Sequence, residues 1–317
     1  MSGFQIRHFA PGDEAQVVRL LRQVLDRPGA GAHDEAYFRW KHLENPFGPS
    51  IMLVAEAEGR IVGFRAIMRW RLEANGHAVA AGRPVDTVTD PALRRQGVFS
   101  ALTRAVLKDI DAQRVELLFN TPNEQSLPGY LKMGWTALGR ATRDIFVGGP
   151  LVWARLMGAR LDGRRPAHRP ATGAPGTWED LAGALRSAPS AALRVAKGPA
   201  YLRWRYAQHP WFRYEIVPDA PVATVMRVAE GRRIPVAIVA ESAARGLDLW
   251  THVLWAVARR AATPVVQVLY TPARAGPSGR GWFRLAREGP MIVVRSPRPD
   301  LLDLKAWSLG TGELEFF

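Results

Sequence analysis

The sequence predicts an α/β (α+β) protein made of two domains, each a mixed, mostly antiparallel sheet flanked by helices. Strand-like and helix-like apolar patterns alternate along the first half, where Glu58-Gly59 and Asn75-Gly76 are turn signals that join neighbouring strands. Three short motifs of the first half recur in the second half in the same order. With 317 residues, the chain is long enough for two domains of ordinary size.

The first half is expected to form a domain over residues 1–150. Asp13 can cap a helix, because the apolar residues from Val17 to Leu25 recur at helical spacing. Strands are expected at 51–56, 61–71, 85–89, 115–120, 135–138 and 144–147, and helices at 98–110 and 125–133.

The second half repeats motifs of the first half. The repeated segments are 37–41 and 201–205, 121–122 and 271–272, and 134–140 and 281–287. Because their order is kept, they predict a duplicated domain at 181–317, joined through a Pro-, Gly- and Arg-rich linker at 151–180. The helical spacing of the first repeated motif predicts that Trp40 and Trp204 pack into the fold.

Residues 85–98 have the pattern of a phosphate-binding turn. An apolar run ends at Thr89, a short basic loop follows, and a helix opens at Val98. The first N–H groups of such a helix have no partner within the helix and can bind phosphate oxygens. Gly97 allows a close approach of the ligand, and Arg94 and Arg95 add positive charge. The alternative is an ordinary strand–turn–helix with a solvated arginine pair.

This segment resembles the coenzyme-A motif of the GNAT superfamily of N-acyltransferases, Gln/Arg-x-x-Gly-x-Gly/Ala. Arg94 fills the first position and Gly97 the fourth, whereas Phe99 stands where the family has Gly or Ala. The resemblance covers roughly residues 4–147 and implies acetyl-CoA, or another acyl-CoA, as co-substrate, with no metal. The coenzyme contacts that it implies are Thr87, Val88, Thr89, Arg94, Arg95, Gln96, Gly97, Val98, Phe99, Ser100, Asn120, Asn123, Ser126 and Tyr130.

A second segment, residues 123–135, is similar to the family's Asn…Tyr-x-x-x-Gly-Phe segment, with Trp135 in place of Phe. The resemblance implies that Tyr130 is the general acid that protonates the departing thiolate. The alternative reading of Tyr130 is a core aromatic residue with one hydrated end.

The general base is left open among several carboxylates. Asp86 lies on the strand before the phosphate loop, where partial burial would raise its pKa and let it accept a proton from the amine. Glu124 and Glu56 are the alternatives. Asp86 could instead bond only to backbone or to a nearby arginine.

The duplicated second domain is expected to have lost this chemistry. Residues 239–247 contain no Arg-x-x-Gly motif at a helix start, and the position of the tyrosine is taken by Ser278 or a neighbour. A degenerate domain of this kind would shape a cleft or an interface without binding coenzyme A.

The charge distribution bears on the acceptor. The net charge is +14, of which residues 1–150 carry +3 and residues 151–317 carry +11. This favours a neutral or anionic small-molecule amine, such as an amino sugar carrying a nucleotide or an intermediate of secondary metabolism, over a polycationic one. A binding module for nucleic acid or the ribosome, a decarboxylase and a carrier-protein acyltransferase are the alternatives. Nucleic acid is disfavoured as a partner because no basic tail or recognition motif is present.

Composition narrows the remaining possibilities. The chain has no cysteine, so it has neither disulfides nor a thiol nucleophile. It has no signal-peptide pattern and no apolar run that could span a bilayer, and we therefore expect a cytoplasmic protein with no membrane partner. The oligomeric state is left open.

Overall fold

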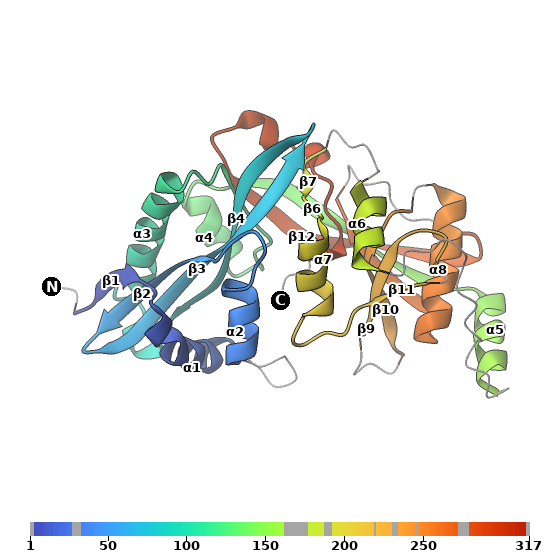
Figure 1. The fold of residues 1–317 in the computed structure, drawn as a ribbon, viewed down its shortest axis with the longest axis horizontal. Helices are drawn as coiled ribbons and strands as arrows, with labels where there is room; N and C mark the ends of the chain where they lie inside the picture. Colours follow the sequence, from blue (N-terminus) through green and yellow to red (C-terminus); the bar gives the residue numbers. More distant parts are fainter. Residues whose placement is uncertain are drawn as a thin grey trace.

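The structure is a computed structural model that describes residues 3–26, 33–161, 177–186, 192–218, 220–229, 234–244, 246–271 and 279–314. Its strands form one mixed, mostly antiparallel sheet of twelve strands with helices packed against it (Figure 1). The expected fold class is confirmed, but the sheets of the two halves are joined into one.

The first half begins at the sheet edge and follows the expected order of elements. It comprises β1 (Gln5–His8), α1 (Glu14–Leu25), α2 (Glu35–His42), β2 (Ile51–Ala57), β3 (Arg60–Ala74), β4 (His77–Thr89), α3 (Val98–Ala112), β5 (Leu117–Asn120), α4 (Leu127–Lys132) and β6 (Thr136–Gly148). Asn75 and Gly76 both have positive φ, which is the geometry of the tight hairpin expected between β3 and β4.

After β6, the helix α5 begins at Pro150 and covers the start of the segment expected to be a linker. The elements of the second half are α5 (Pro150–Leu161), α6 (Trp178–Arg186), β7 (Arg194–Val195), α7 (Pro199–Leu202), β8 (Glu215–Ile216), β9 (Thr224–Ala229), β10 (Val236–Ser242), α8 (Leu247–Ala261), β11 (Val265–Tyr270), β12 (Trp282–Arg295) and α9 (Thr311–Leu314). Residues 162–176 of the expected linker lie outside the described residues.

The two halves exchange their last long strands. The strand order is β1-β2-β3-β4-β5-β12-β6-β11-β10-β9-β8, so β12 of the second half pairs with β5 of the first, and β6 of the first half pairs with β11 of the second. The strands expected at 135–138 and 144–147 are in fact the continuous strand β6, which crosses from one half to the other. β6 and β12 pair antiparallel along their length, from Gly148–Trp282 to Thr136–Val294.

A second reciprocal contact joins the halves. Trp40 Nε1 donates to the carbonyl oxygen of Trp204 at 2.7 Å, and Trp204 Nε1 donates to the carbonyl oxygen of Trp40 at 2.7 Å. The rings stack with centroids 4.9 Å apart, and both residues are buried. The prediction that the two tryptophans pack into the fold is confirmed.

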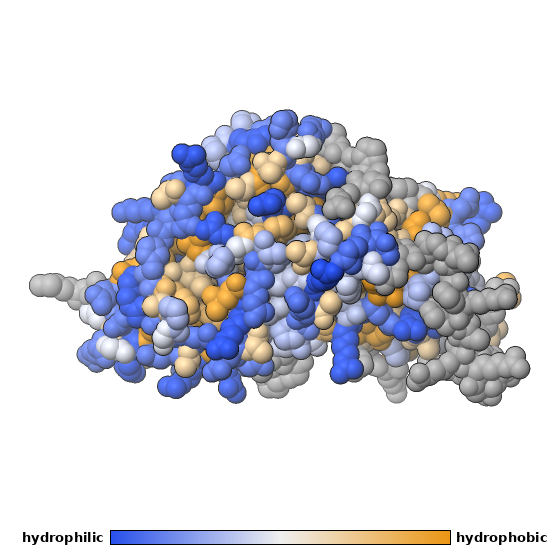
Figure 2. Space-filling view, in the orientation of Figure 1, coloured by the Kyte–Doolittle hydropathy of each residue, from blue (hydrophilic) through white to orange (hydrophobic). Residues whose placement is uncertain are grey.

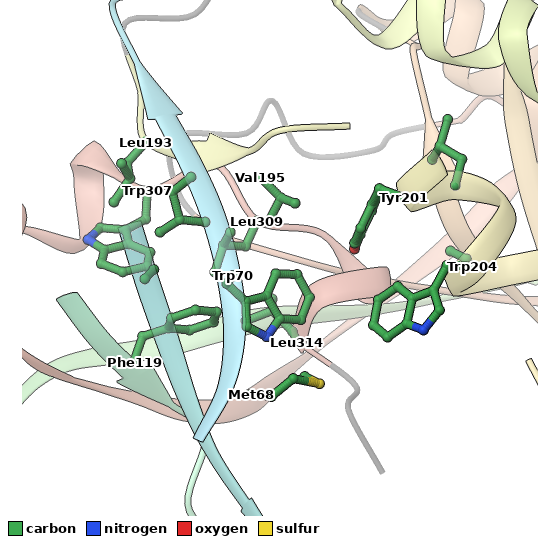
Figure 3. Packing of buried hydrophobic residues seen from close by; sticks show 14 of the residues in the cluster. Met68, Trp70, Phe119, Leu193, Val195, Tyr201, Trp204, Trp307, Leu309 and Leu314 are labelled. Atoms are coloured by element: carbon green, nitrogen blue, oxygen red, sulfur yellow. The ribbon is translucent and has the colours of Figure 1, made fainter. Parts of the chain in front are cut away.

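The core at this junction draws on both halves (Figure 3). Trp70 and Phe119 of the first half meet Tyr201, Trp307 and other residues of the second half in one buried cluster. Burial of such large aromatic side chains contributes roughly 1.5–3 kcal/mol each, which makes the junction part of the folded core rather than a loose contact.

Two helices of the first half cover opposite faces of its sheet. α1 packs its buried residues, among them Val17 and Leu21, against Phe64 of β3. α3 packs on the other face, where a Cβ at Gly63 would lie only 2.7 Å from Val98. The glycine therefore lets α3 approach β3 closely.

Hydrophilic side chains cover most of the face seen in Figure 2, with smaller apolar areas between them. None of the described helices is both long and apolar enough to cross a bilayer.

Candidate active site

The predicted coenzyme residues gather where β4 and β5 separate. β4 and β5 run parallel, and the last recorded pair is Gly82–Leu118, although β4 continues to Thr89. Thr87 and Thr89 are half-buried on this free stretch, and Val88 is buried against α1. A parallel pair that ends early leaves backbone groups of β4 available to a ligand.

β4 carries a bulge within this stretch. Phe64 of β3 pairs with Val88 and Ala66 pairs with Val85, so two residues of β4, Asp86 and Thr87, face the single residue Arg65. Asp86 has a φ of 48°, a conformation that residues other than glycine adopt rarely. Bulges redirect backbone groups and are frequent next to active sites.

The turn expected to bind phosphate has the predicted loop-to-helix form at the start of α3. Gly97 caps the helix with a φ of 85°, and a Cβ placed there would have no atom within 4 Å. Ala101 is the first residue to donate back, to the carbonyl oxygen of Gly97, so the N–H groups of Val98, Phe99 and Ser100 precede the helical bonding pattern. Arg94, Arg95 and Gln96 are exposed around this helix end.

Tyr130 lies next to the end of β5. Asn120 Nδ2 donates to the Tyr130 hydroxyl at 2.7 Å, and the ring packs edge-on against Trp135 with centroids 4.9 Å apart. Burial raises the pKa of Tyr130, and the charges of Arg65 and Arg83 together with the Asn120 bond act against this rise. Tyr130 therefore keeps its proton at neutral pH, as a general acid must.

Asp86 does not have the expected raised pKa. Burial acts to raise it, but Lys41 Nζ lies 2.7 Å from one carboxylate oxygen and His42 Nε2 lies 2.9 Å from the other. These two partners hold the pKa of Asp86 well below its usual range. The expectation failed because α2, which is distant in sequence, brings two basic side chains to the bulge.

The other carboxylates are placed differently. Glu124 is exposed on the loop before α4. Its neighbour Asn123 is also exposed and accepts bonds from the backbone N–H and the hydroxyl of Ser126, each at 2.9 Å. Glu56 pairs with Arg7 at 2.7 Å on β2, which β3 separates from β4, so the structure does not bring it to the site.

Four residues at the site were missed by sequence reasoning: Lys41, His42, Arg65 and Arg83. Arg83 is buried and donates to Thr121 Oγ1 at 2.6 Å and to the carbonyl oxygen of Glu313. Arg65 and Arg83 each interrupt an apolar strand sequence. A charged residue inside such a run is the signal that could have found them.

The second half also has a bulged strand followed by a helix, but the helix α9 covers the ends of its strands β10 and β11. β10 carries a bulge between Val239 and Glu241, and α8 begins after Gly246, whose φ is also positive. The end of β11 and the short helix α9 bond to each other, with Leu269 N donating to Thr311 Oγ1 at 2.9 Å. A Cβ at Gly312 would lie 2.9 Å from Glu241 Oε1. The chain's own α9 therefore fills the space beside β10 and β11.

The position equivalent to Tyr130 in the second half, expected at Ser278, lies outside the described residues. Glu241, by contrast, is well defined. It is fully buried and bonded to Lys197 Nζ at 2.7 Å and to the Tyr206 hydroxyl at 2.8 Å.

A separate hollow of about 430 Å³ lies between β1, β2 and α3. Its lining includes Arg104 and Lys108 of α3 and contains none of the predicted site residues. The strand separation, the bulge and Tyr130 therefore define the candidate site, and this hollow does not.

Comparison with known proteins also finds an acetyltransferase domain in the first half of the chain. Residues 5–138 match the model of the acetyltransferase (GNAT) domain. No curated protein matches the chain in sequence.

Solved structures share the fold over most of the chain. A probable N-acyltransferase of Enterococcus faecalis is 12% identical, with a TM-score of 0.61 over 92% of this chain and 72% of that one. GCN5-related N-acetyltransferases of Anabaena variabilis (14% identity, TM-score 0.58, 92% and 72%) and Kribbella flavida (15% identity, TM-score 0.57, 92% and 71%) are similar to the same extent. At these identities the likeness concerns the fold.

The domain that residues 5–138 match is that of acyl-CoA N-acyltransferases. Residues 5–138 thus carry a match to the GNAT acetyltransferase domain, within a chain whose whole fold resembles those structures.

Proposed function

We propose that this protein transfers an acyl group, most simply acetyl, from coenzyme A to a primary amine of a small molecule. One observation carries the proposal: the bulge of β4, the start of α3 and the hydroxyl of Tyr130 all lie around the same separation of β4 from β5. Each supplies one requirement of direct acyl transfer, namely a polar backbone for the thioester, a seat for the pyrophosphate and an acid for the leaving thiolate.

The pyrophosphate would bind at the N-terminus of α3. The N–H groups of Val98, Phe99 and Ser100 point along the positive end of the helix dipole, and Arg94 and Arg95 lie beside it. The open surroundings of Gly97 leave room for phosphate oxygens close to the backbone.

The thioester would lie along the free stretch of β4. Backbone N–H groups at the bulge polarise its carbonyl, the amine attacks the carbon, and Tyr130 protonates the sulfur as the C–S bond breaks. Asp86 orients the bulge through Lys41 and His42. Of the three carboxylates considered as base candidates, Glu124 is the exposed one, and the amine proton leaves the site near it.

The acceptor is proposed to be neutral or anionic. Residues 151–317 carry a net charge of +11, which repels a polycationic amine and attracts an anionic one. An amino sugar carrying a nucleotide, or an intermediate of secondary metabolism, fits this charge.

We also propose that the chain is a duplication: a first domain over 1–150, a connecting segment over 151–180 and a degenerate second domain over 181–317. The reciprocal Trp40–Trp204 contact and the exchange of β6 and β12 support it, because both relate matching motifs of the two halves. The packing of α9 beside β10 and β11 supports the loss of coenzyme binding in the second half.

Calorimetry with coenzyme A tests the placement. Gly97→Trp is expected to abolish measurable binding, because the indole occupies the phosphate seat. Gly76→Trp is the matched control, since Gly76 also has positive φ and open surroundings but lies on the β3–β4 hairpin. Equal affinity in the wild type and Gly97→Trp would discard the site. The acceptor is then sought by thiol release from acetyl-CoA with a panel of primary amines.

A further inference from the structure

Arg65 stands apart among the buried cations of this protein. The described part of the chain buries four cationic side chains, Lys41, Arg65, Arg83 and Arg205. Lys41 bonds to a carboxylate, and Arg83 and Arg205 donate to carbonyl oxygens of Glu313 and Gly312. Arg65 is only 4% exposed, its Nε has no hydrogen-bond partner, and no carboxylate of the described residues forms an ion pair with it.

The side chain of Arg65 points to the face of the sheet that carries α3. Gly63, two residues earlier on β3, faces Val98 of α3, and alternate residues of a strand share a face. The guanidinium carbon of Arg65 lies 5.3 Å from the centre of the Phe99 ring, in the first turn of α3. Arg65 and Tyr130 also interact electrostatically, so the cation lies near Tyr130 as well as near the first turn of α3.

A buried cation without an anion is unfavourable, because burial removes hydration that no opposite charge replaces. Proteins keep such a group where a negative charge arrives during function. Acyl transfer from a thioester produces one negative charge at this place, first on the departing sulfur and then on the phenolate of Tyr130. The resting site therefore has the complementary charge already in position.

We propose that Arg65 is the cation that stabilises the negative charge on the departing sulfur and on Tyr130, an inference that rests on the proposed acyl transfer. The C–S bond breaks with its electron pair on sulfur, the O–H bond of Tyr130 breaks as the S–H bond forms, and the phenolate regains a proton from the water that took up the amine proton. Arg65 faces a single negative charge throughout.

The same placement accounts for Phe99, which departs from the small residue of the family motif. The face of an aromatic ring attracts a cation, so Phe99 holds the guanidinium while its outer edge remains partly exposed. The charged and titratable groups around the sulfur position are then Arg65, Arg83 and Tyr130, together with the positive end of α3.

The test uses bound coenzyme A, because its free thiol reports the charge at the sulfur without an acceptor. The ultraviolet absorbance of the thiolate is followed against pH for the full-length protein. The thiol of bound coenzyme A is expected to have a lower pKa than that of free coenzyme A, and Arg65→Met is expected to return it toward the free value. Arg65→Lys keeps the charge and should stay close to the wild type. Arg69→Met is the matched control, since Arg69 lies on the same strand and face but bonds to Pro49 and Gln113.

Two further readouts separate this role from a structural one. With acetyl-CoA and the fastest amine of the panel, Arg65→Met should lower kcat at least about tenfold with little change in KM, while its melting temperature stays equal or rises because an unpaired buried charge is removed. An unchanged thiol pKa on binding in the wild type overturns the proposal, even if the variant fails to fold. So does an unchanged kcat in Arg65→Met. A wild type that does not bind coenzyme A at all instead refutes the proposed function itself.

Discussion

The two halves of this protein share a bulged strand followed by a helix, and they differ in what lies beside that strand. In both, a bulged strand holds a buried acidic residue, Asp86 or Glu241, against a lysine from a preceding segment. In both, a helix then begins after a glycine of positive φ. Beside β4 the backbone extends beyond its pairing with β5, whereas beside β10 the helix α9 packs against the strand ends.

Under the proposed duplication, the second half has kept the internal architecture of the first half while losing its coenzyme site. The ion pairs Asp86–Lys41 and Glu241–Lys197 lie below the surface and hold the bulged strands in shape. The halves differ in what lies at the ends of their central strands. In the first half these are polar residues such as Asn120 and Tyr130, and in the second half it is the helix α9.

The largest effect is expected from Tyr130→Phe. Loss of the hydroxyl removes the proposed acid, and we expect kcat to fall about 10²-fold with coenzyme affinity nearly unchanged. The rate is measured by thiol release and the affinity by calorimetry. Tyr206→Phe in the second half, where the hydroxyl bonds to Glu241, should leave kcat within about threefold of the wild type. An unchanged rate in Tyr130→Phe removes this residue from the mechanism.

The next effect concerns α9. A methyl group at Gly312 would overlap the Tyr206 hydroxyl and crowd Glu241. We expect Gly312→Ala to lower the free energy of unfolding by about 1–3 kcal/mol, measured by urea denaturation. Gly198→Ala, at a glycine with open surroundings, is the control. Calorimetry of the same variant should still show one molecule of coenzyme A bound per chain. Two bound molecules would mean that the second half retains a coenzyme site.

The third prediction concerns pH. Burial lowers the pKa of His209 to about 3, with Arg205 and Arg227 contributing. A folded pKa below the ordinary value of about 6.5 means that the unfolded chain takes up the proton first. His209 therefore contributes fully above pH 6.5, and stability falls as the pH drops toward 3, by about 2 kcal/mol at pH 5.

His209→Asn checks this prediction. Nδ1 of His209 accepts from Trp211 N at 3.1 Å, just as Oδ1 of Asn45 accepts from Phe47 N at 2.9 Å in the first half. Asparagine can thus keep the turn without titrating. The loss of stability between pH 6.5 and 5 should shrink in this variant, and an identical pH profile would contradict the assignment.

The smallest effects belong to the tryptophan pair. Trp40→Phe and Trp204→Phe each remove one indole donor and so one buried hydrogen bond, and we expect each to cost about 1–2 kcal/mol of unfolding free energy. Because the two hydrogen bonds have matching geometry, we expect the two losses of unfolding free energy to agree within about 0.5 kcal/mol. Urea denaturation of both variants and of the double variant measures these losses, and clearly unequal losses would contradict the expectation.

Much of the first half could be predicted from the sequence, because its elements rest on local patterns. The hairpin at Asn75-Gly76, the start of α3 at Gly97 and the position of Tyr130 follow from turn chemistry, helix capping and motif spacing. The continuous strand β6 could not be predicted, since its partner β12 lies more than a hundred residues away.

The charge states of the site residues could not be predicted from the sequence either. The pKa of Asp86 depends on Lys41 and His42, which α2 brings across from a distant part of the chain. Arg65 could be noticed as a charge in an apolar strand, but only the fold shows that no carboxylate of the described residues forms an ion pair with it. Local patterns thus locate the groups, and tertiary contacts set their protonation.

The exchange of β6 and β12 has a consequence for biosynthesis. The N-terminal half leaves the ribosome before the strand that pairs with β5 has been made, because β12 ends only at Arg295. Until then β5 and β6 present open edges, which readily join strands of other chains. Nascent chains are therefore most exposed to misassembly late in translation, and a gene fragment that stops after residue 150 should yield an aggregating product rather than a miniature enzyme.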